Sequence, residues 1–175
     1  MDRLQISFVT EVHGAQRRVL GAEHPETLTS ANNLAGSLSG QGKYADAERI
    51  QREVHGAQRR VLGAEHPDTL TTAGNLAGSL AYQGKHADAE RFGREVLEVR
   101  KRVLGAEHPK ALTNANNLAT SLSNQGKYAD AERIEREVHG VRNRVFGAEH
   151  PDTLTSASSL AMCHVPLRPR QIRRR

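Results

Sequence analysis

The sequence has few of the residues that usually anchor a large globular core. Aromatic residues make up 3% of the 175 residues, and there is no tryptophan. Any core must therefore be built from alanine, leucine and valine, which favours closely packed helices over an aromatic-centred globule. One cysteine, Cys163, is present, so an internal disulfide is excluded and nothing in the sequence requires an oxidising compartment.

Long hydrophobic runs and an even spread of positive charge are also missing. The N-terminal stretch MDRLQISFVTEV is too polar for a signal peptide or a membrane span, so we expect a soluble, cytoplasmic protein without a membrane partner. The net charge of +5 comes from the C-terminal tail, and the rest of the chain is balanced. Without a basic face, nucleic acid is not expected as the main partner. The tail arginines are Arg168, Arg170, Arg173, Arg174 and Arg175.

What the sequence does contain is a repeat with a period of 42 residues. The string GAEHP ends at Pro25, Pro67, Pro109 and Pro151, which are spaced 42 residues apart. Residues 22–63 and 106–147 differ at only 10 of their 42 positions. Self-similarity at a fixed period is typical of a repeat architecture, in which each unit buries its apolar surface against its neighbours.

Each unit contains two helical patterns. In the first unit, Pro25 suits the first turn of a helix, and Gly42 ends that helix. Apolar residues recur at three- and four-residue spacing along each pattern, which predicts one buried stripe per helix. The first stripe is Leu28, Ala31, Leu34, Ala35 and Leu38. The second is Tyr44, Ala47, Ile50, Val54, Ala57 and Val61, before Gly63.

Glycines interrupt several of these helical patterns. Gly36 and Gly78 fall inside first helices, where glycine costs roughly 1 kcal/mol relative to alanine. We interpret these two glycines as points where neighbouring helices approach each other closely.

The repeat borders divide the chain into six segments. These are a half repeat with a second helix only (1–21), three complete units (22–63, 64–105 and 106–147), a half repeat with a first helix only (148–164) and a basic disordered tail (165–175). Because both flanks are open, Leu154, Leu160 and Met162 are expected to be partly exposed. We therefore expect marginal stability at both ends or end-to-end self-association.

The motifs within each unit resemble a known repeat family. The segment NNLA (Asn32–Ala35), followed by Leu38 and by QGKYADAE (Gln41–Glu48), is similar to a tetratricopeptide repeat. The 42-residue period, with EHP before the first helix and VLG after the second, resembles the kinesin light chain type of this repeat. The resemblance implies an all-α fold, a right-handed α-solenoid of stacked antiparallel helix pairs. The chain departs from the family where a second-helix aromatic is usual, at Gln51, Gly93 and Glu135.

The resemblance also implies where a ligand would bind, because the first helices of such arrays line a concave groove. The lining is small and polar, and asparagine amides can donate to and accept from the backbone of an extended peptide. With the turn lysines included, we predict a site for a partner peptide, in particular an acidic segment. Asn33, Asn75 and Asn117 are expected instead to bond a neighbouring turn or helix. The predicted site residues are Thr29, Asn32, Ser39, Lys43, Thr71, Tyr82, Lys85, Thr113, Asn116, Thr120, Ser123, Asn124 and Lys127.

The predicted function is a protein–protein interaction scaffold, of which a kinesin light chain-like cargo adaptor is one form. The alternative is a sensor fragment of a larger NTPase-type signalling or immune receptor, and a more distant one is contact of the arginine-rich tail with nucleic acid or an anionic surface. No metal or other cofactor is expected, because His24, His66, His108 and His150 lie one repeat apart. Cys163 stands beside His164 without a catalytic geometry, so we do not expect an enzyme.

Overall fold

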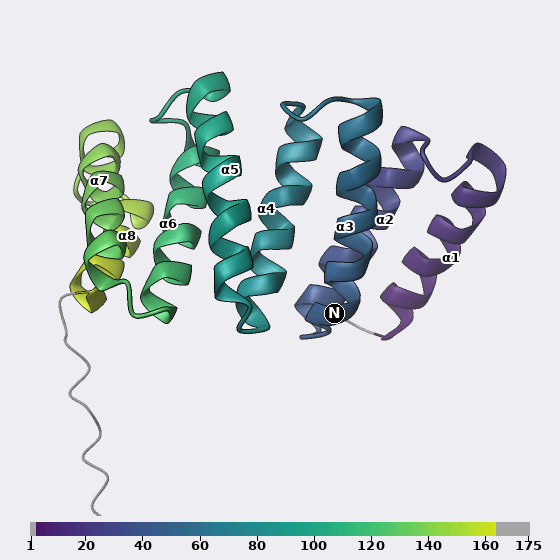
Figure 1. Ribbon diagram of the computed structural model, residues 1–175, viewed down its shortest axis with the longest axis horizontal. Coiled ribbons are helices and arrows are strands. Elements are labelled where there is room, and N and C mark those ends of the chain that lie inside the picture. The colour runs from purple at the N-terminus through teal and green to yellow at the C-terminus, as the bar shows by residue number, and fades with distance from the viewer. Residues whose placement is uncertain (1–2, 164–175) are drawn as a thin grey trace, which may run out of the picture.

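The computed structural model describes residues 3–163, with the side chains of residues 7–161. Every regular element in this part of the chain is an α-helix, and successive helices pack side by side as antiparallel pairs (Figure 1). The predicted solenoid of stacked helices is thereby confirmed, while the tail (165–175) lies outside the described residues. The helices are α1 (Arg3–Leu20), α2 (Pro25–Gly40), α3 (Tyr44–Val61), α4 (Pro67–Tyr82), α5 (His86–Leu104), α6 (Pro109–Asn124), α7 (Tyr128–Phe146) and α8 (Pro151–Cys163).

A histidine caps the start of each of the helices α2, α4 and α6. His24, His66 and His108 have extended backbones, and each ring Nδ1 accepts a hydrogen bond from the backbone N–H two residues further on. The distances are 3.3, 3.2 and 3.1 Å. The following proline has no N–H to leave unpaired in the first turn. The EHP motif is therefore a helix-start signal.

The turn between the two helices of a unit depends on one glycine. Gly42 has a φ of 75°, a conformation that L side chains rarely adopt. The next backbone N–H, that of Lys43, donates to the carbonyl of Leu38 at 3.0 Å and closes the turn. The same turn recurs at Gly84 and Gly126, so the chain returns along the preceding helix in every complete unit.

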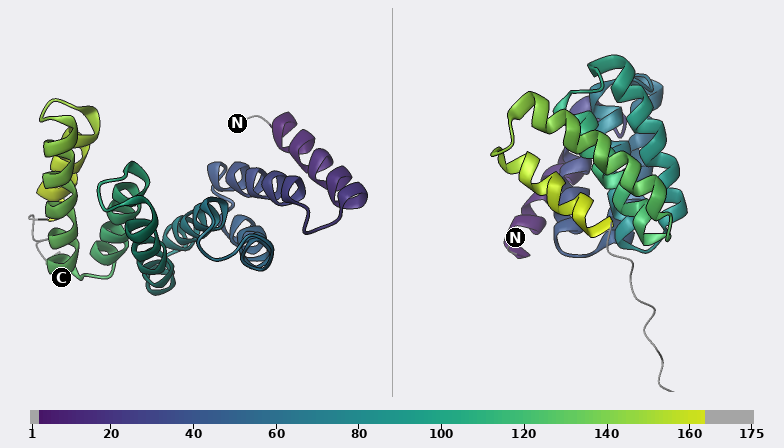
Figure 2. Two further views of the ribbon diagram at one scale, coloured as in Figure 1. Left: turned by 90° about the horizontal axis from the view of Figure 1, so that it is seen from above. Right: turned by 90° about the vertical axis from the view of Figure 1, so that its left-hand side faces the viewer.

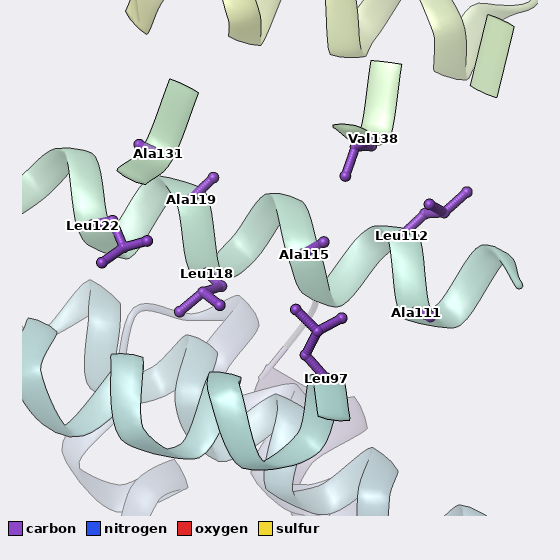
Figure 3. Packing of buried hydrophobic residues seen from close by; sticks show 9 residues of the cluster. All are labelled: Leu97, Ala111, Leu112, Ala115, Leu118, Ala119, Leu122, Ala131 and Val138. Atoms are coloured by element: carbon purple, nitrogen blue, oxygen red, sulfur yellow. The ribbon is translucent and has the colours of Figure 1, made fainter. Parts of the chain in front are cut away.

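The core is built from small and medium apolar side chains that neighbouring helices share. Around α6, buried residues of α5, α6 and α7 form one continuous cluster (Figure 3). Ala119 of α6 faces Ala131 of α7, and Leu118 points toward α5. Alanines in the contact allow the helices to pack closely without large side chains. The other members of the cluster are Leu97, Ala111, Leu112, Ala115, Leu122 and Val138.

The stack of helices is bent. The first helices of neighbouring units touch, α2 with α4 and α4 with α6, whereas the second helices of neighbouring units have no comparable contact. The first helices therefore lie on the inner side of the bend, as Figure 2 shows from above. This arrangement gives the array one face that is formed mainly by α2, α4, α6 and α8.

One position in the second helices is buried but does not hold an apolar residue. Gln51 of α3 is 1% exposed and Glu135 of α7 is 2% exposed. Neither Oε1 of Gln51 nor Oε2 of Glu135 has a hydrogen-bond partner among the described residues. Burial raises the pKa of Glu135 to about 7, although the positive charge of Arg142 acts in the opposite direction. The folded protein therefore holds this carboxyl in its neutral form below about pH 7.

We predict that Glu135→Gln stabilises the protein above neutral pH. Because the folded-state pKa is raised from 4.5 to about 7, native stability is lost as the pH rises between these values. At about pH 8 the variant should unfold with a free energy about 1–3 kcal/mol larger than the parent, and at about pH 4 the difference should vanish. Urea denaturation at the two pH values measures both differences.

The matched control is Glu137→Gln, two residues along the same helix. Glu137 is exposed and forms a surface ion pair with Lys101 at 3.1 Å. Its substitution should change stability by about 0.5 kcal/mol or less at either pH. An equal response of the two variants, or no pH dependence for Glu135→Gln, would show that the buried carboxyl is not destabilising.

Candidate functional site

The inner face carries almost no charge. In each of the helices α2, α4, α6 and α8, the only charged residue is the second one, next to the initial proline. From there on the exposed positions hold threonine, asparagine, serine, glycine or alanine, with one tyrosine and, on α8, Leu154. A ligand on this face would therefore be held by amide hydrogen bonds and apolar contact more than by charge.

The predicted threonines have partners of their own. Thr29, Thr71 and Thr113 each donate their hydroxyl to the carbonyl of the proline four residues earlier, at 2.9, 2.8 and 3.0 Å. Thr120 donates to the carbonyl of Asn116 at 3.0 Å. Their hydroxyl protons are thus used within the helix, and each oxygen is left to accept a hydrogen bond from a ligand.

The sequence predicts that the first asparagine of each pair faces the ligand and that the second is structural, but it is the second that is more exposed. Asn32 and Asn116 are only half-exposed, and their Oδ1 atoms are buried without a partner. Asn33, Asn75 and Asn117 are exposed, and their side-chain amides make no hydrogen bond among the described residues, so the prediction that they bond a neighbouring turn or helix is wrong. The helical turn places the second asparagine of each pair on the inner face, where its whole amide is available.

The interpretation of the two first-helix glycines is also wrong. A Cβ added to Gly36 or Gly78 would meet no atom within 4 Å, so these positions are not points of close helix approach. Gly78 instead borders open space on the inner face, next to α6. The glycines therefore widen the face rather than allowing helices to approach.

A hollow of about 280 Å³ lies between α4 and α6 on this face. Its floor is apolar and comes from small side chains of α4 and α5 together with Leu118 of α6. Its rim is polar, and three of the predicted site residues stand on it: Tyr82, Thr120 and Asn124. Asn117, which we did not predict, also lines it. The remaining lining residues are Gly74, Ala77, Gly78, Ala81, Ala89, Gly93, Asn114 and Ser121.

Gly93 explains why the hollow lies in this unit. It occupies the position at which α3 buries the side chain of Gln51 and α7 buries that of Glu135. Gly74 likewise stands where Asn32 and Asn116 stand in the other two units. Two side chains that fill the neighbouring units are absent from this one, and the space that they would occupy opens toward the inner face.

A buried arginine holds the two walls of the hollow together. Arg100 of α5 donates to the carbonyl of Leu70 in α4 at 3.2 Å and to Oδ1 of Asn114 in α6 at 2.6 Å. Burial lowers the pKa of its guanidinium, which stays charged at neutral pH. A Cβ at position 74 would lie 3.4 Å from Oδ1 of Asn114, so Gly74 leaves room for this bridge.

An exposed aromatic pair borders the rim. Tyr82 is 74% exposed, and its ring stacks on that of Tyr44 with centroids 4.8 Å apart and planes 11° from parallel. Tyr82 stands where Gly40 and Asn124 stand in the other units, so the pair occurs once among the described residues. Of the predicted serines, Ser39 shares a hydrogen bond of 3.2 Å with Ser79, and Ser123 is half-exposed.

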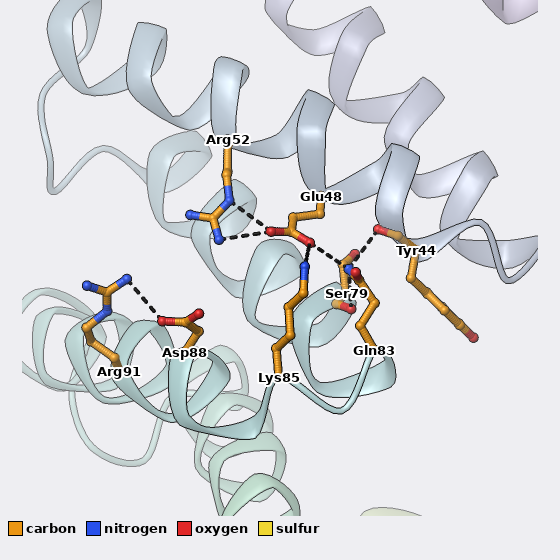
Figure 4. Close-up of polar contacts among 8 residues, drawn as sticks. All are labelled: Tyr44, Glu48, Arg52, Ser79, Gln83, Lys85, Asp88 and Arg91. Atoms are coloured by element: carbon orange, nitrogen blue, oxygen red, sulfur yellow. Dashed lines mark hydrogen bonds and ion pairs between the residues drawn. The ribbon is translucent and has the colours of Figure 1, made fainter.

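Two of the three predicted lysines are held in internal clamps. Lys85 donates to Oε2 of Glu48 at 2.7 Å, and Gln83 donates to the same oxygen at 2.8 Å (Figure 4). Arg52 donates to the other carboxylate oxygen at 3.0 Å. The clamp joins a second helix to the turn of the next unit, since Gln83 also donates to the carbonyl of Tyr44 at 3.1 Å.

The clamp is repeated one unit further on, with Glu90, Lys127, Gln125 and Arg94 in the same roles. The side chains of Glu48 and Glu90 are 12% and 13% exposed. Hydrogen bonds, first of all from the lysine, lower the pKa of each carboxyl to about 2. Lys43 has no such partner among the described residues, because the sequence has Ile6 at the position of Glu48 in the preceding unit.

We predict that Glu48→Gln lowers the free energy of unfolding by about 1–2 kcal/mol at neutral pH, because a charged hydrogen-bond acceptor is lost from a half-buried network. The folded pKa is depressed, so the stabilisation is present above 4.5 and is lost as the pH falls toward about 2. The gap between parent and variant in chemical denaturation should therefore narrow below about pH 4.5 and close as the pH approaches about 2.

Glu53→Gln provides the control for the clamp. Glu53 lies on the same helix in an exposed pair with Arg49, with an N–O distance of 3.6 Å. Its loss should cost about 0.5 kcal/mol or less. If the two variants lose the same stability, the clamp contributes no more than a surface ion pair.

The described residues contain no group of three or more histidine, cysteine, aspartate or glutamate side chains that could hold a metal ion. None of the described helices is long and apolar enough to cross a membrane. The stacked helix pairs and the hollowed, nearly uncharged inner face define a helical-repeat scaffold of the α-solenoid class.

Comparison with known families agrees with this class. A profile of the tetratricopeptide repeat family matches residues 31–102 and 72–143, which together span more than half of the chain. The chain belongs to the tetratricopeptide repeat family. This fold indicates a scaffold for protein–protein interaction, and scaffolds of this kind are generally not enzymes. No curated protein matches the sequence.

Several solved structures are similar to the chain. Two crystal structures of a candidate kinesin light chain from Podosopora anserina with nearly identical TPR-like repeats have TM-scores of 0.83 and 0.81. Both are 26% identical, and the match covers 90% of this chain and 74% and 75% of theirs. BtubC (BKLC) from P. vanneervenii shares the fold, with a TM-score of 0.74, 22% identity, and coverage of 91% of this chain and 64% of that one.

Proposed function

We propose that the protein binds an extended segment of a partner protein on its inner face, with one bulky apolar side chain of that segment in the hollow between α4 and α6. The observation that carries the proposal is the hollow itself, which combines an apolar floor with a rim of amides and hydroxyls. Such a combination suits a peptide, because apolar contact supplies affinity and a few polar groups fix the backbone.

Asn117 and Asn124 are the rim residues best suited to the peptide backbone. Both are exposed on α6, and each amide offers donors and an acceptor to an extended chain. Tyr82 faces them from the end of α4 and presents a large apolar surface. The predicted residues Asn32 and Asn116 have a smaller role in this proposal, because their amide oxygens are buried.

An acidic residue in the peptide could pair with a lysine at only one end of the inner face. Lys85 and Lys127 already neutralise Glu48 and Glu90, which leaves Lys43 as the predicted lysine without an ion pair among the described residues. We therefore propose a ligand that is mostly uncharged, with an acidic residue near Lys43 only. Its affinity should vary little with salt, since few charges are neutralised on binding.

Within this function, we favour an adaptor of the kinesin light chain type. The 42-residue unit with its long second helix and the likeness to the candidate light chain of Podosopora anserina both support this form. The proposal concerns how a partner segment is held, and cargo selection would follow from the side chain that enters the hollow.

Gly78→Leu tests the site without harming the fold. The position borders open space on the inner face, so a leucine fits there and also removes the cost of a helical glycine, about 1 kcal/mol. We expect the variant to be as stable as the parent or more so, while its side chain fills the hollow. The probe is a displayed library of random peptides about a dozen residues long, selected on the parent protein.

Peptides selected on the parent should share one bulky apolar residue and should bind Gly78→Leu at least about tenfold more weakly. Gly140→Leu is the matched control, because Gly140 is an exposed helical glycine of α7 whose added Cβ also meets no atom within 4 Å. It should bind as the parent does. Equal binding to Gly78→Leu and the parent would show that the hollow is not the site.

A further inference from the structure

The two ends of the array expose apolar surface that interior units bury. In the first complete unit, Leu28 and Ala31 of α2 pack against Val54 and Ala57 of α3, and Ile50 packs against this cluster. Leu28 is 4% exposed and Val54 is 3% exposed. This contact between the two helices of one unit is the pattern against which the ends can be compared.

On α8, no second helix among the described residues covers the same stripe. Leu154 stands 126 residues, or three periods, after Leu28, and it is 53% exposed. Ala157 stands in the same relation to Ala31 and is half-exposed. Among the described residues, the packing partner of α8 is α7, on its other side.

On α1, no first helix among the described residues covers the complementary stripe. Phe8, Val12 and Ala15 stand one period before Ile50, Val54 and Ala57. Phe8 is 66% exposed, Ala15 is exposed and Val12 is half-exposed. The packing partner of α1 is α2. The two open stripes therefore match each other as the two sides of the contact between α2 and α3.

Charged residues at the two ends match in the same register. In every complete unit the glutamate before the first helix pairs with an arginine near the end of the second: Glu23 with Arg60, Glu65 with Arg102, and Glu107 with Arg144. By the same period, Glu149 should pair with the equivalent of Arg18. Neither Glu149 nor Arg18 forms an ion pair among the described residues.

We propose that α1 of a second copy of this chain packs on α8, so that the chains associate head to tail. Leu154 and Ala157 would then cover Val12 and Ala15 of the second copy, and Glu149 would pair with its Arg18. A single contact would cover both exposed stripes, since α8 would stand as the first helix for α1 and α1 as the second helix for α8.

The contact leaves an open end on each copy, and therefore it does not close into a dimer. The two faces lie at opposite ends of the elongated array (Figure 1), so repetition of the contact adds copies in a row. One helix-to-helix contact buries less surface than a permanent interface, so the association is reversible and depends on concentration. The inner face would continue from α8 of one copy to α2 of the next.

Two single variants of the full chain test the contact, each blocking one face. Leu154→Glu places a charge in the α8 face, and Phe8→Glu places one in the α1 face. By sedimentation velocity over a roughly hundredfold range of concentration, the parent should form a series of oligomers and each variant alone should stay monomeric. Mixed in equal amounts, the two variants should form a dimer and nothing larger, because each retains one intact face.

Circular dichroism of both variants should match that of the parent, which separates a blocked face from a failure to fold. Val103→Glu is the matched control, because Val103 is an exposed apolar residue in the middle of the array, 46% exposed. It should associate as the parent does. A parent chain that stays monomeric throughout the range would overturn the proposal. A dimer that never grows would show a symmetric contact instead, which also contradicts it.

A charge exchange tests the register independently. Glu149→Arg and Arg18→Glu should each weaken self-association by about two- to fivefold, because one ion pair per contact is replaced by like charges. In the mixture, both contacts between unlike copies bring opposite charges together. The two substituted residues meet in one contact, and the unchanged Glu149 and Arg18 meet in the other, so the series of oligomers should recover. Lack of recovery in the mixture would rule out the pairing of Glu149 with Arg18.

Discussion

The structure depends on one constraint: the row of apolar side chains along each helix must be buried against the next helix in the chain. The core has no large aromatic centre, so stability comes from many contacts between alanine, leucine and valine on adjacent helices. Such contacts are local, and every interior helix needs a neighbour on both sides. The clamps around Glu48 and Glu90 and the bridge from Arg100 reinforce the same junctions, since each ties one unit to the next.

The packed core is formed mostly by positions at which the three units share the same residue. Positions at which the units differ produce the hollow and the buried carboxyl. Gly93 leaves out a side chain that the neighbouring units bury, Gly74 leaves out one that they half-bury, and the hollow between α4 and α6 is the consequence. Glu135 occupies the same position as Gly93 but buries a carboxyl, which makes α7 sensitive to pH. The same repeat position therefore contributes to the hollow in the second unit, through Gly93, and places an ionisable side chain in the core of the third unit, through Glu135.

The fold could be predicted from the sequence because period, proline and glycine each specify local geometry. EHP begins a helix through the histidine cap, and Gly42 turns the chain back, so the order of the helices in the described part of the chain follows directly. The site could be predicted only in part. The helical pattern identified the first-helix face, but it could not tell which asparagine of each pair pointed outward. It also could not show that Lys85 and Lys127 are bound by glutamates 37 residues earlier. Those facts depend on packing between units.

The most direct test of the binding face is the side-chain amide spectrum of the asparagines by NMR, recorded while a peptide selected on the parent protein is added. The amide signals of Asn117 and Asn124 should shift, because both line the hollow. The signal of Asn143, which is exposed on the second helix α7, should stay in place. Shifts at Asn143 with none at Asn117 and Asn124 would contradict the account, since the ligand would then lie on the second helices.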